Sequence, residues 1–343
     1  MTTESQSTTL APTTEVLAGA PAARRWTRER SLKLAEAAAL PVLFIVMVIV
    51  FAVAEPGSYL TVGNIANVLG TNTVLLVIMV GALIPLLVGE FDLSVASVSG
   101  FSAMLVATLN VNLHVSVLLA CLVALVASAA VGAFNAVFVV CFENNSFIIT
   151  LASGTAVTGI VYAISGSETV SGTDAGLSTW TYGNTFLGIP LEFYYGIAVV
   201  LLAWYLLEMT PLGQRTMFTG QNRSVARLSG VRVPRVRAGA FIFAGLVGGL
   251  SGIFAVGTAG AADPSSGPAL LLPALAAVFL GMTTIRPGRL NVVGAAIAAY
   301  FLASGVAGLE LLGVQNWVQD VFYGAALVVA VTASQLLRRG LAR

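Results

Sequence analysis

Two carboxylates interrupt a long apolar stretch of the chain. Glu90 and Asp92 are the only acidic residues between positions 74 and 109. A charged side chain at the centre of a bilayer costs about 2.5–3.5 kcal/mol on insertion scales, so in a membrane span these carboxylates must lie at an interface or inside the protein. Two interpretations stay open: a capped turn between two helices, or a carboxylate that binds a proton or coupling cation in a broken helix.

The residues around these carboxylates have the types that end one helix and begin the next. Pro85 and Gly89 are expected to break the incoming helix, while Asp92 and Ser94 can each accept free amide protons at the start of the outgoing helix. The predicted helix-break motif comprises Gly89, Glu90, Asp92, Leu93 and Ser94.

The longest basic loop, residues 210–237, contains a second candidate site. Asn222 is a favoured N-cap residue and Gly230 is a favoured residue just beyond a helix C-terminus, so two helical turns are predicted between them. At helical spacing Val225 and Leu228 share one face, and the arginines of this segment share another.

Such a short amphipathic peg has two possible partners. It has the shape to dock an apolar ridge in a groove of another protein, with arginines meeting carboxylates at the rim. It can instead lie against anionic lipid headgroups. The residues predicted to make these contacts are Gly220, Gln221, Asn222, Arg223, Val225, Ala226, Arg227, Leu228 and Gly230.

The chain lacks the residues of an energy-converting enzyme. A Walker A loop requires Lys followed by Ser or Thr, but the single lysine, Lys33, precedes Leu34. One histidine, His114, is too few for a multi-histidine metal site, and Cys121 and Cys141 lie in one apolar stretch, as buried small hydrophobes do. We therefore expect no catalytic residue, metal or cofactor in this chain.

The elements that must position these residues are membrane spans. Apolar residues make up 57% of the chain and charged residues 9%, with a mean hydropathy of +0.93, which leaves too little polar surface for a soluble protein. All sixteen Lys and Arg residues fall in four clusters, within 24–33, 215–237, 286–289 and 338–343. Such clusters mark the cytoplasmic loops of a polytopic membrane protein, and a net charge of +1 favours no nucleic-acid partner.

Hydropathy predicts an all-α polytopic membrane protein with ten spans. Residues 1–36 are expected to be a disordered cytoplasmic tail, residues 37–337 a transmembrane domain, and residues 338–343 a cytoplasmic C-terminal tail. Ten crossings place both termini and every basic cluster in the cytoplasm, although the eighth span is short and carries Pro273. The expected spans are residues 38–54, 71–89, 93–110, 115–141, 147–165, 190–209, 238–257, 269–283, 291–308 and 317–337.

The order of several motifs resembles one known family. The helix-break motif, the segment SFIITL at 146–151, the peg, and the glycine-rich segment 245–252 resemble permease subunits of ribose- and xylose-type ABC importers, over roughly residues 40–337. The resemblance implies a type II-like permease in the cytoplasmic (inner) membrane of a prokaryote. It also implies a homodimer, an extracytoplasmic binding protein that delivers a monosaccharide, and two cytoplasmic ATPase subunits, which hold ATP and Mg and grip the peg as a coupling helix.

A solute pathway is then expected at the axis of the permease dimer. Small and weakly polar side chains there allow close helix approach and substitute for the hydration of a sugar. The same side chains can instead form hydrogen bonds between packed helices. The candidates are Asn135, Phe147, Thr150, Ser153, Thr155, Thr158 and Ser251.

The chain departs from the family pattern at two places. Relatives commonly carry Pro and Glu after the Asn of the peg, where this chain has Arg223 and Ser224, and a turn rich in Gly and Ser where this chain has residues 283–289. The first difference suggests an interface matched to its own ATPase, and the second leaves the solute open. The alternatives are an ABC permease for nucleosides or branched-chain amino acids, and an ion-coupled carrier that uses Glu90 or Asp92.

Overall fold

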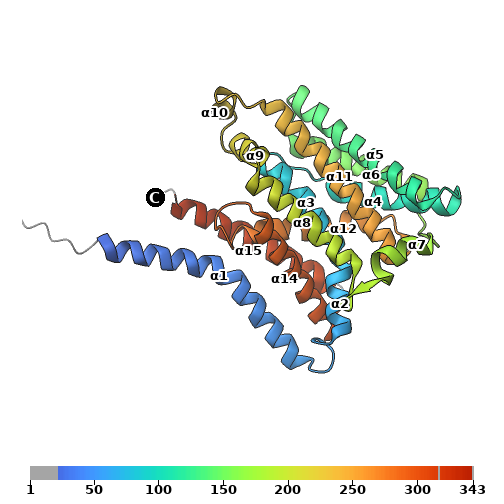
Figure 1. The fold of residues 1–343 in the computed structure, drawn as a ribbon, viewed down its shortest axis with the longest axis horizontal. Coiled ribbons are helices and arrows are strands. Elements are labelled where there is room, and N and C mark those ends of the chain that lie inside the picture. The colour runs from blue at the N-terminus through green and yellow to red at the C-terminus, as the bar shows by residue number, and fades with distance from the viewer. Residues whose placement is uncertain (1–21, 316, 342–343) are drawn as a thin grey trace, which may run out of the picture. The chain divides into compact units, whose positions relative to one another are not determined.

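The computed structural model of the chain describes residues 22–315 and 317–341. The chain divides into two units, residues 1–35 and residues 36–343. The described part of the first unit is helical and belongs to α1, and the arrangement set out below is that of the second unit (Figure 1).

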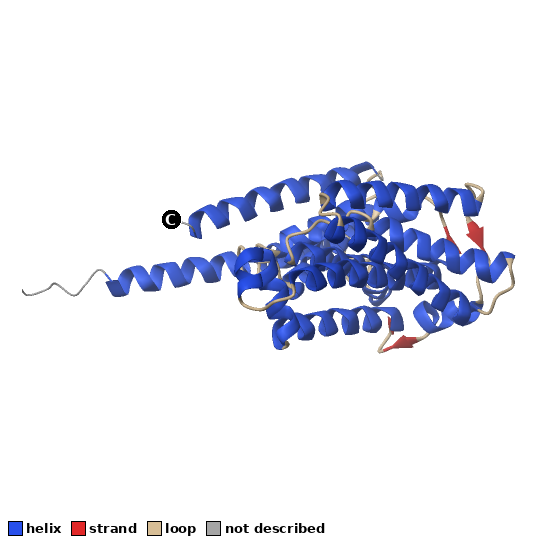
Figure 2. Cartoon of the chain, turned by 90° about the horizontal axis from the view of Figure 1, so that it is seen from above, coloured by secondary structure: helices blue, strands red, loops and turns tan. Residues whose placement is uncertain are grey.

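Helices make up almost all of the second unit, with two short strand pairs (Figure 2). Strand β1 (Val170–Ser171) pairs antiparallel with β4 (Ala261–Ala262), and β2 (Thr185–Phe186) pairs antiparallel with β3 (Ile189–Pro190). The helices are α1 (Ala22–Ala54), α2 (Val62–Thr71), α3 (Thr73–Leu87), α4 (Val95–Ala107), η1 (Thr108–Asn112), α5 (Val117–Ala136), η2 (Val137–Cys141), α6 (Ser146–Ser165), α7 (Ala175–Ser178), η3 (Thr179–Gly183), α8 (Leu191–Met209), α9 (Pro211–Gln221), α10 (Arg223–Leu228), α11 (Val233–Ala259), α12 (Ser266–Ala269), α13 (Leu271–Gly281), α14 (Val292–Leu311) and α15 (Trp317–Leu341), where η marks a π-helical turn.

The predicted all-α membrane fold is confirmed. Among the described residues, eight helical segments are long and apolar enough to cross a bilayer. The two remaining expected spans, 269–283 and 317–337, coincide with shorter apolar helices at Ser266–Gly281 and Trp317–Thr332. The sequence therefore located every apolar helix, while ten full crossings stay a prediction.

The structure differs from the expected disordered tail at residues 22–36. These residues continue α1, which runs without a break from Ala22 to Ala54. The segment is rich in Ala, Leu, Arg and Glu, which are strong helix formers, and it contains no Gly or Pro. Local helix propensity explains why this segment is helical. Residues 1–21 lie outside the part of the chain that the structure describes.

Helix α3 lies at the centre of the membrane domain. Its residues from Thr73 to Leu83 are all buried, because α8, α11, α13 and α14 pack around it. A helix that is apolar on every side must be covered by other helices. The sequence between Asn72 and the helix-break motif therefore forms the core against which the other helices are placed.

The glycine-rich segment of α11 permits backbone contact with α4 and α5. A Cβ atom at Gly252 would lie 2.2 Å from the carbonyl oxygen of Ser99, and one at Gly245 would lie 2.5 Å from that of Ser128. Small residues at helix crossings allow this close approach in membrane proteins. Helix α11 is thereby packed tightly against two neighbours along most of its length.

The two ends of the bundle carry different elements. Helices α9 and α10 lie at one end, and α2, α7 and the β2–β3 hairpin lie at the opposite end (Figure 1). The loop 210–237 and the helix-break motif meet at the α9–α10 end. The candidate site is built there.

Candidate functional site

Helix α3 ends in a turn that only glycine adopts easily. Gly89 has φ +76°, its amide donates to the carbonyl of Leu86 at 3.1 Å, and the amide of Glu90 donates to the carbonyl of Pro85 at 3.0 Å. This pair of bonds is the Schellman pattern, which requires a left-handed residue just beyond the helix. The predicted break is confirmed, and it directs Glu90 back into the protein.

Glu90 is held by two arginines from different elements. Its side chain is only 5% exposed, and its Oε1 accepts from Arg223 Nη2 at 2.6 Å and from Arg237 Nε at 2.6 Å. Arg223 is the first residue of α10, and Arg237 lies in the first turns of α11. A buried charge requires such partners, so this cluster, here called the Glu90 ion-pair cluster, joins the α3–α4 break to α10 and α11.

Asp92 caps α4 through a small buried network. Its Oδ1 accepts from the Ser94 amide at 2.9 Å and from the Ser94 hydroxyl at 2.6 Å. Asn135 of α5 donates from Nδ2 to the same hydroxyl at 2.8 Å. Asp92 therefore acts as expected, but Ser94 does not cap with its side chain, because its hydroxyl is already committed to Asp92 and Asn135.

The start of α6 binds the backbone of the break. The Ser146 hydroxyl accepts from the Phe91 amide at 3.1 Å, and the Thr150 hydroxyl accepts from the Leu93 amide at 3.0 Å. These bonds satisfy amides that the turn leaves without a helical partner. The segments 89–94 and 146–151, which the sequence analysis singled out separately, therefore form one structural unit.

The predicted two-turn helix is present as α10. Asn222 Oδ1 accepts from the amides of Ser224 at 3.0 Å and Val225 at 3.1 Å. At the other end Gly230 has φ +80°, and its amide donates to the Arg227 carbonyl at 3.0 Å. A helix of six residues is too short to be stable by itself, so these two caps define it.

The side chains of α10 are divided differently from the sequence prediction. Leu228 is 90% exposed and Val225 is 50% exposed, so the apolar face is uncovered in this chain, while Ala226 is buried. Arg223 was expected to share a free basic face with Arg227. It instead turns back to Glu90, because burial of that carboxylate demands a cation, and Arg227 stays exposed.

Helix α9 touches the break by direct backbone contact. A Cβ atom at Gly220 would lie 2.0 Å from the carbonyl oxygen of Leu87, and the nearest atoms to a Cβ at Gly89 belong to Gly220. Only glycine at position 220 permits this approach. The C-terminal end of α9 is therefore seated on the last turn of α3.

A polar groove opens beside α10. It has a volume of about 720 Å³ and is lined by the break, the α5–α6 connection, α10 and the start of α11. Arg223, Arg227 and Arg237 contribute three positive charges, and Glu90 and Glu143 contribute two negative charges. Two residues of α10, Arg223 and Arg227, line the groove, while Val225 and Leu228 of the same helix are exposed outside it.

Most of the proposed pathway residues form helix-packing hydrogen bonds. Asn135, Thr150 and Ser251 are fully buried, and Ser251 donates to the Val74 carbonyl of α3 at 3.0 Å. Thr158 donates to Ser97 of α4 at 3.1 Å. This arrangement is the packing alternative of the sequence analysis, and these hydroxyls are occupied within the described chain.

The remaining pathway candidates bond locally or are exposed. Ser153 and Thr155 donate to carbonyls of their own helix α6. Thr155 and Phe147 are exposed, and Phe147 lies edge-on to Phe91 with ring centroids 6.4 Å apart. Because Thr155 and Phe147 lie on the exposed face of α6, both remain candidates for the solute pathway. Their contact with a solute stays a prediction.

The Glu90 ion-pair cluster does not offer a cation site. Oε1 already accepts from two guanidinium groups, which together outweigh the single carboxylate. No group of three or more His, Cys, Asp or Glu residues within the described part of the chain could hold a metal ion. The capped-turn interpretation of the break thus fits the geometry, whereas a cation at Glu90 would have to compete with the two guanidinium groups.

Sequence reasoning did not assign a role to Arg237. It was counted only as part of the basic loop 210–237, although it lies inside an apolar helix and is just 11% exposed. A cation in the first turns of a membrane span requires a buried partner. Glu90 is another charge that interrupts an apolar stretch, so the sequence could have indicated that Glu90 and Arg237 form a buried pair.

Comparison with known proteins agrees with this geometry. Residues 64–331 match the family described as the branched-chain amino acid transport system permease component. The chain is 31% identical over 293 residues to the ribose import permease protein RbsC of Escherichia coli strain K12, a match covering 84% of this chain and 91% of the relative. The chain belongs to this permease family. No solved structure matches it.

Two further relatives belong to the same permease family. The ribose import permease protein RbsC of Bacillus subtilis strain 168 is 34% identical over 288 residues, covering 83% of this chain and 88% of the relative. The autoinducer 2 import system permease protein LsrC of Salmonella paratyphi B is 32% identical over 308 residues, covering 90% and 88%. The family expected from the motifs is confirmed, and family members are transport subunits and not enzymes.

The Glu90 ion-pair cluster predicts unequal effects of its two arginines on the stability of the permease. Arg237→Gln leaves buried Glu90 with one partially exposed partner and is expected to lower the free energy of unfolding by about 3 kcal/mol, as when a buried pair is broken. Arg223→Gln removes a pair whose cation is 44% exposed, so a loss of about 0–1 kcal/mol is expected. Denaturant unfolding of the purified protein measures both, and equal losses would contradict the assignment.

Proposed function

We propose that this chain is the membrane-spanning subunit of an ATP-binding-cassette importer for a monosaccharide or a similar neutral polar solute. The observation that carries the proposal is the uncovered apolar face of α10, capped at both ends and anchored to the membrane helices through Glu90. The relatives include ribose and autoinducer 2 import permeases, which supports an import function and a sugar-like solute.

Helix α10 is proposed to dock in a cleft of a separate ATPase subunit. Val225 and Leu228 form the apolar ridge, and Arg227 lies beside it to meet acidic residues at the rim of the cleft. The groove of about 720 Å³ would receive neighbouring residues of the same partner. ATP and Mg would be bound by that ATPase, since this chain has no Walker A lysine.

The structure supports a direct mechanical route from α10 to the helices. A displacement of α10 acts on the α3–α4 break through Arg223 and through the backbone contact of Gly220. It acts on α11 through the shared carboxylate of Glu90 and Arg237. Because α11 has close backbone contacts with α4 and α5, a small shift at one end would move a packed group of helices as a unit.

The remaining parts of the importer follow from this assignment. We propose that two copies of the chain form a homodimer, that an extracytoplasmic binding protein delivers the solute, and that the α9–α10 end faces the cytoplasm of a prokaryote. The four basic clusters support this orientation in the cytoplasmic membrane, with both termini inside.

A neutral solute fits the charge distribution better than an amino acid. Between Lys33 and Arg215 the sequence has no Lys or Arg, and none of the ten predicted spans contains either residue, so the spans offer no permanent cation for a solute carboxylate. Recognition of a carboxylate usually employs such a cation. This argument favours a sugar over the branched-chain amino acid that the family description names.

Leu228→Asp tests the docking of α10. Burial of a leucine side chain contributes about 1.5–3 kcal/mol, so its replacement is expected to weaken binding of the ATPase subunit by about tenfold or more. A matched control is Leu187→Asp in the β2–β3 turn at the opposite end, where the side chain is 82% exposed. Binding titrations of the two purified subunits measure the effect, and equal affinity for both variants would contradict the docking surface.

Reconstitution tests the solute class. Liposomes holding this chain, the ATPase subunit and the binding protein are expected to accumulate a radiolabelled pentose or hexose only when ATP is enclosed. Leucine and a nucleoside, offered at the same concentration, are expected to stay outside. ATP-dependent uptake of leucine or a nucleoside would contradict the solute assignment, and uptake by the chain alone on an ion gradient would contradict the importer assignment.

A further inference from the structure

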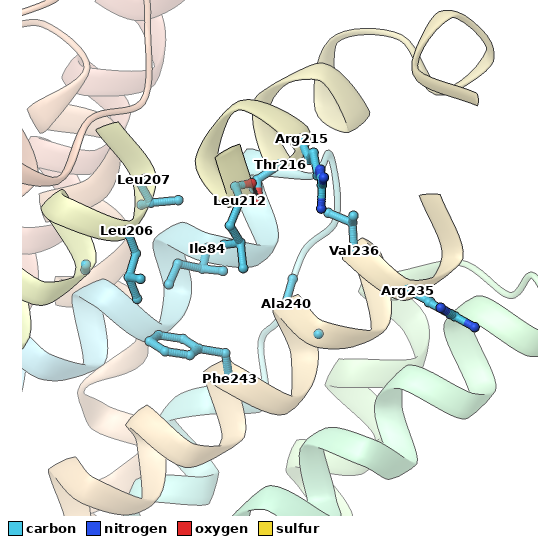
Figure 3. Close-up of a pocket in the computed structure, with 12 residues that line it drawn as sticks. Ile84, Leu206, Leu207, Leu212, Arg215, Thr216, Arg235, Val236, Ala240 and Phe243 are labelled. Carbon is cyan, nitrogen blue, oxygen red and sulfur yellow. Dashed lines mark hydrogen bonds between the residues drawn. The ribbon is translucent and has the colours of Figure 1, made fainter. Parts of the chain in front are cut away.

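An apolar cleft lies between α3, α8, α9 and α11 near the α9–α10 end. It has a volume of about 280 Å³, and side chains of α3, α8 and α11, among them Ile84, Leu206 and Phe243, face a common space in Figure 3. Leu212 of α9 reaches into the same space from above. Arg215 stands at the upper edge, over Val236, so the cleft has an apolar body and a basic edge.

A second pocket adjoins this cleft. It has a volume of about 310 Å³ and shares Arg215, Arg235 and Val236 with the apolar cleft. Arg232 is a further lining residue. In Figure 3 Arg235 extends away from the apolar side chains, on the far side of Val236 from them. The two pockets are therefore neighbours, one with an apolar lining and one bordered by three arginines.

These three arginines differ from those that serve the fold. Arg223, Arg237 and Arg286 each pair with a carboxylate. Arg215, Arg232 and Arg235 are exposed and have no ion pair with any residue that the structure describes. Three uncompensated cations around one small pocket repel one another, and a bound anion relieves that repulsion.

We propose that this site binds one anionic phospholipid from the bilayer leaflet on the α9–α10 side. An acyl chain would fill the apolar cleft, and the phosphate would lie in the adjoining pocket among Arg215, Arg232 and Arg235. Guanidinium groups bind phosphate through paired, charge-assisted hydrogen bonds, and basic pockets between membrane helices on the cytoplasmic side suit acidic headgroups. The proposal concerns lipid and does not depend on which solute is carried.

The lining and the position of the cleft both favour a lipid chain. Its body is formed by apolar side chains of membrane helices, such as Ile84, Leu206 and Phe243. The cleft is also placed where α8 ends at Met209 and α9 begins at Pro211. That is the depth at which a span leaves the hydrocarbon, so phosphate and acyl carbon are present together there.

Photo-crosslinking in nanodiscs of phosphatidylcholine tests the proposal with the full chain. The discs contain a trace of either phosphatidylglycerol or phosphatidylcholine bearing a diazirine on one acyl chain, and labelled peptides are mapped by mass spectrometry. We expect several-fold more labelling of residues 236–243 and 203–212 by the anionic probe. The double variant R215Q/R235Q is expected to reduce labelling by the anionic probe to the level of the neutral probe.

A cleft-filling variant tests the apolar part separately. Gly239 lines the cleft and a Cβ atom there meets nothing within 4 Å, so Gly239→Leu fills the cleft without a clash and is expected to reduce labelling by both probes. The matched control is Gly159→Leu on α6, which also points to open space and is expected to leave labelling unchanged. Arg289→Gln, an exposed arginine in another loop, is the corresponding charge control.

Three results would overturn the proposal. Equal labelling of the cleft by the two probes would remove the role of the arginines as a phosphate site. Labelling by the anionic probe that R215Q/R235Q or Gly239→Leu leaves unchanged would place the lipid elsewhere. If neither probe labels the cleft, and its residues become protected from exchange or chemical modification when a second copy of the chain or the ATPase subunit binds, the cleft belongs to a protein interface.

Discussion

The α9–α10 end of the membrane domain depends on how one buried carboxylate is neutralised. Glu90 lies where α3 has ended and α4 has not begun, and its side chain is 5% exposed. A charge in that position is tolerated only with partners, and the chain supplies two, from α10 and from α11. Because both cations meet the same oxygen, the α3–α4 break is joined at one point to two elements that are distant from it in sequence.

This constraint explains how a helix of six residues can serve as a rigid surface feature. Helix α10 has too few residues to be stable by itself. The side chain of Asn222 and the left-handed Gly230 close its two ends, Ala226 packs inward, and Arg223 fixes its first turn to Glu90. What is left uncovered, Val225 and Leu228, is an apolar ridge on a firmly placed support, as a docking helix requires.

How much of this could be read from the sequence depends on whether a feature is local. The ends of α10 were predictable because the capping residues Asn222 and Gly230 act on amides and carbonyls a few positions away. The apolar helices were predictable because length and hydropathy define them. The pairing of Glu90 with Arg237 bridges 147 positions and depends on how α11 packs, which no local pattern encodes.

The pathway candidates show the same limit. Hydroxyl and amide side chains such as Asn135 and Ser251 have the chemistry to meet a sugar, but whether they do depends on what lies opposite. In the structure Asn135 Nδ2 donates to the Ser94 hydroxyl and the Ser251 hydroxyl donates to the Val74 carbonyl, while the buried Oδ1 of Asn135 has no hydrogen-bond partner among the described residues. The prediction for residues 22–36 differs from the structure for a local reason. Their composition suggested disorder, but α1 continues through them, as their helix propensity favours.

Amide hydrogen exchange at the break tests the central claim, that α10 and the α3–α4 break respond as one unit through Glu90. The reporters are the amides of Leu93 and Ser94, which are bonded to Thr150 and Asp92 inside the protein. Adding the ATPase subunit is expected to slow exchange in α10 and at these two amides together, and in the Glu90→Gln variant to slow exchange in α10 alone. Slower exchange in α10 without any change at Leu93 and Ser94 in the native chain would contradict the account.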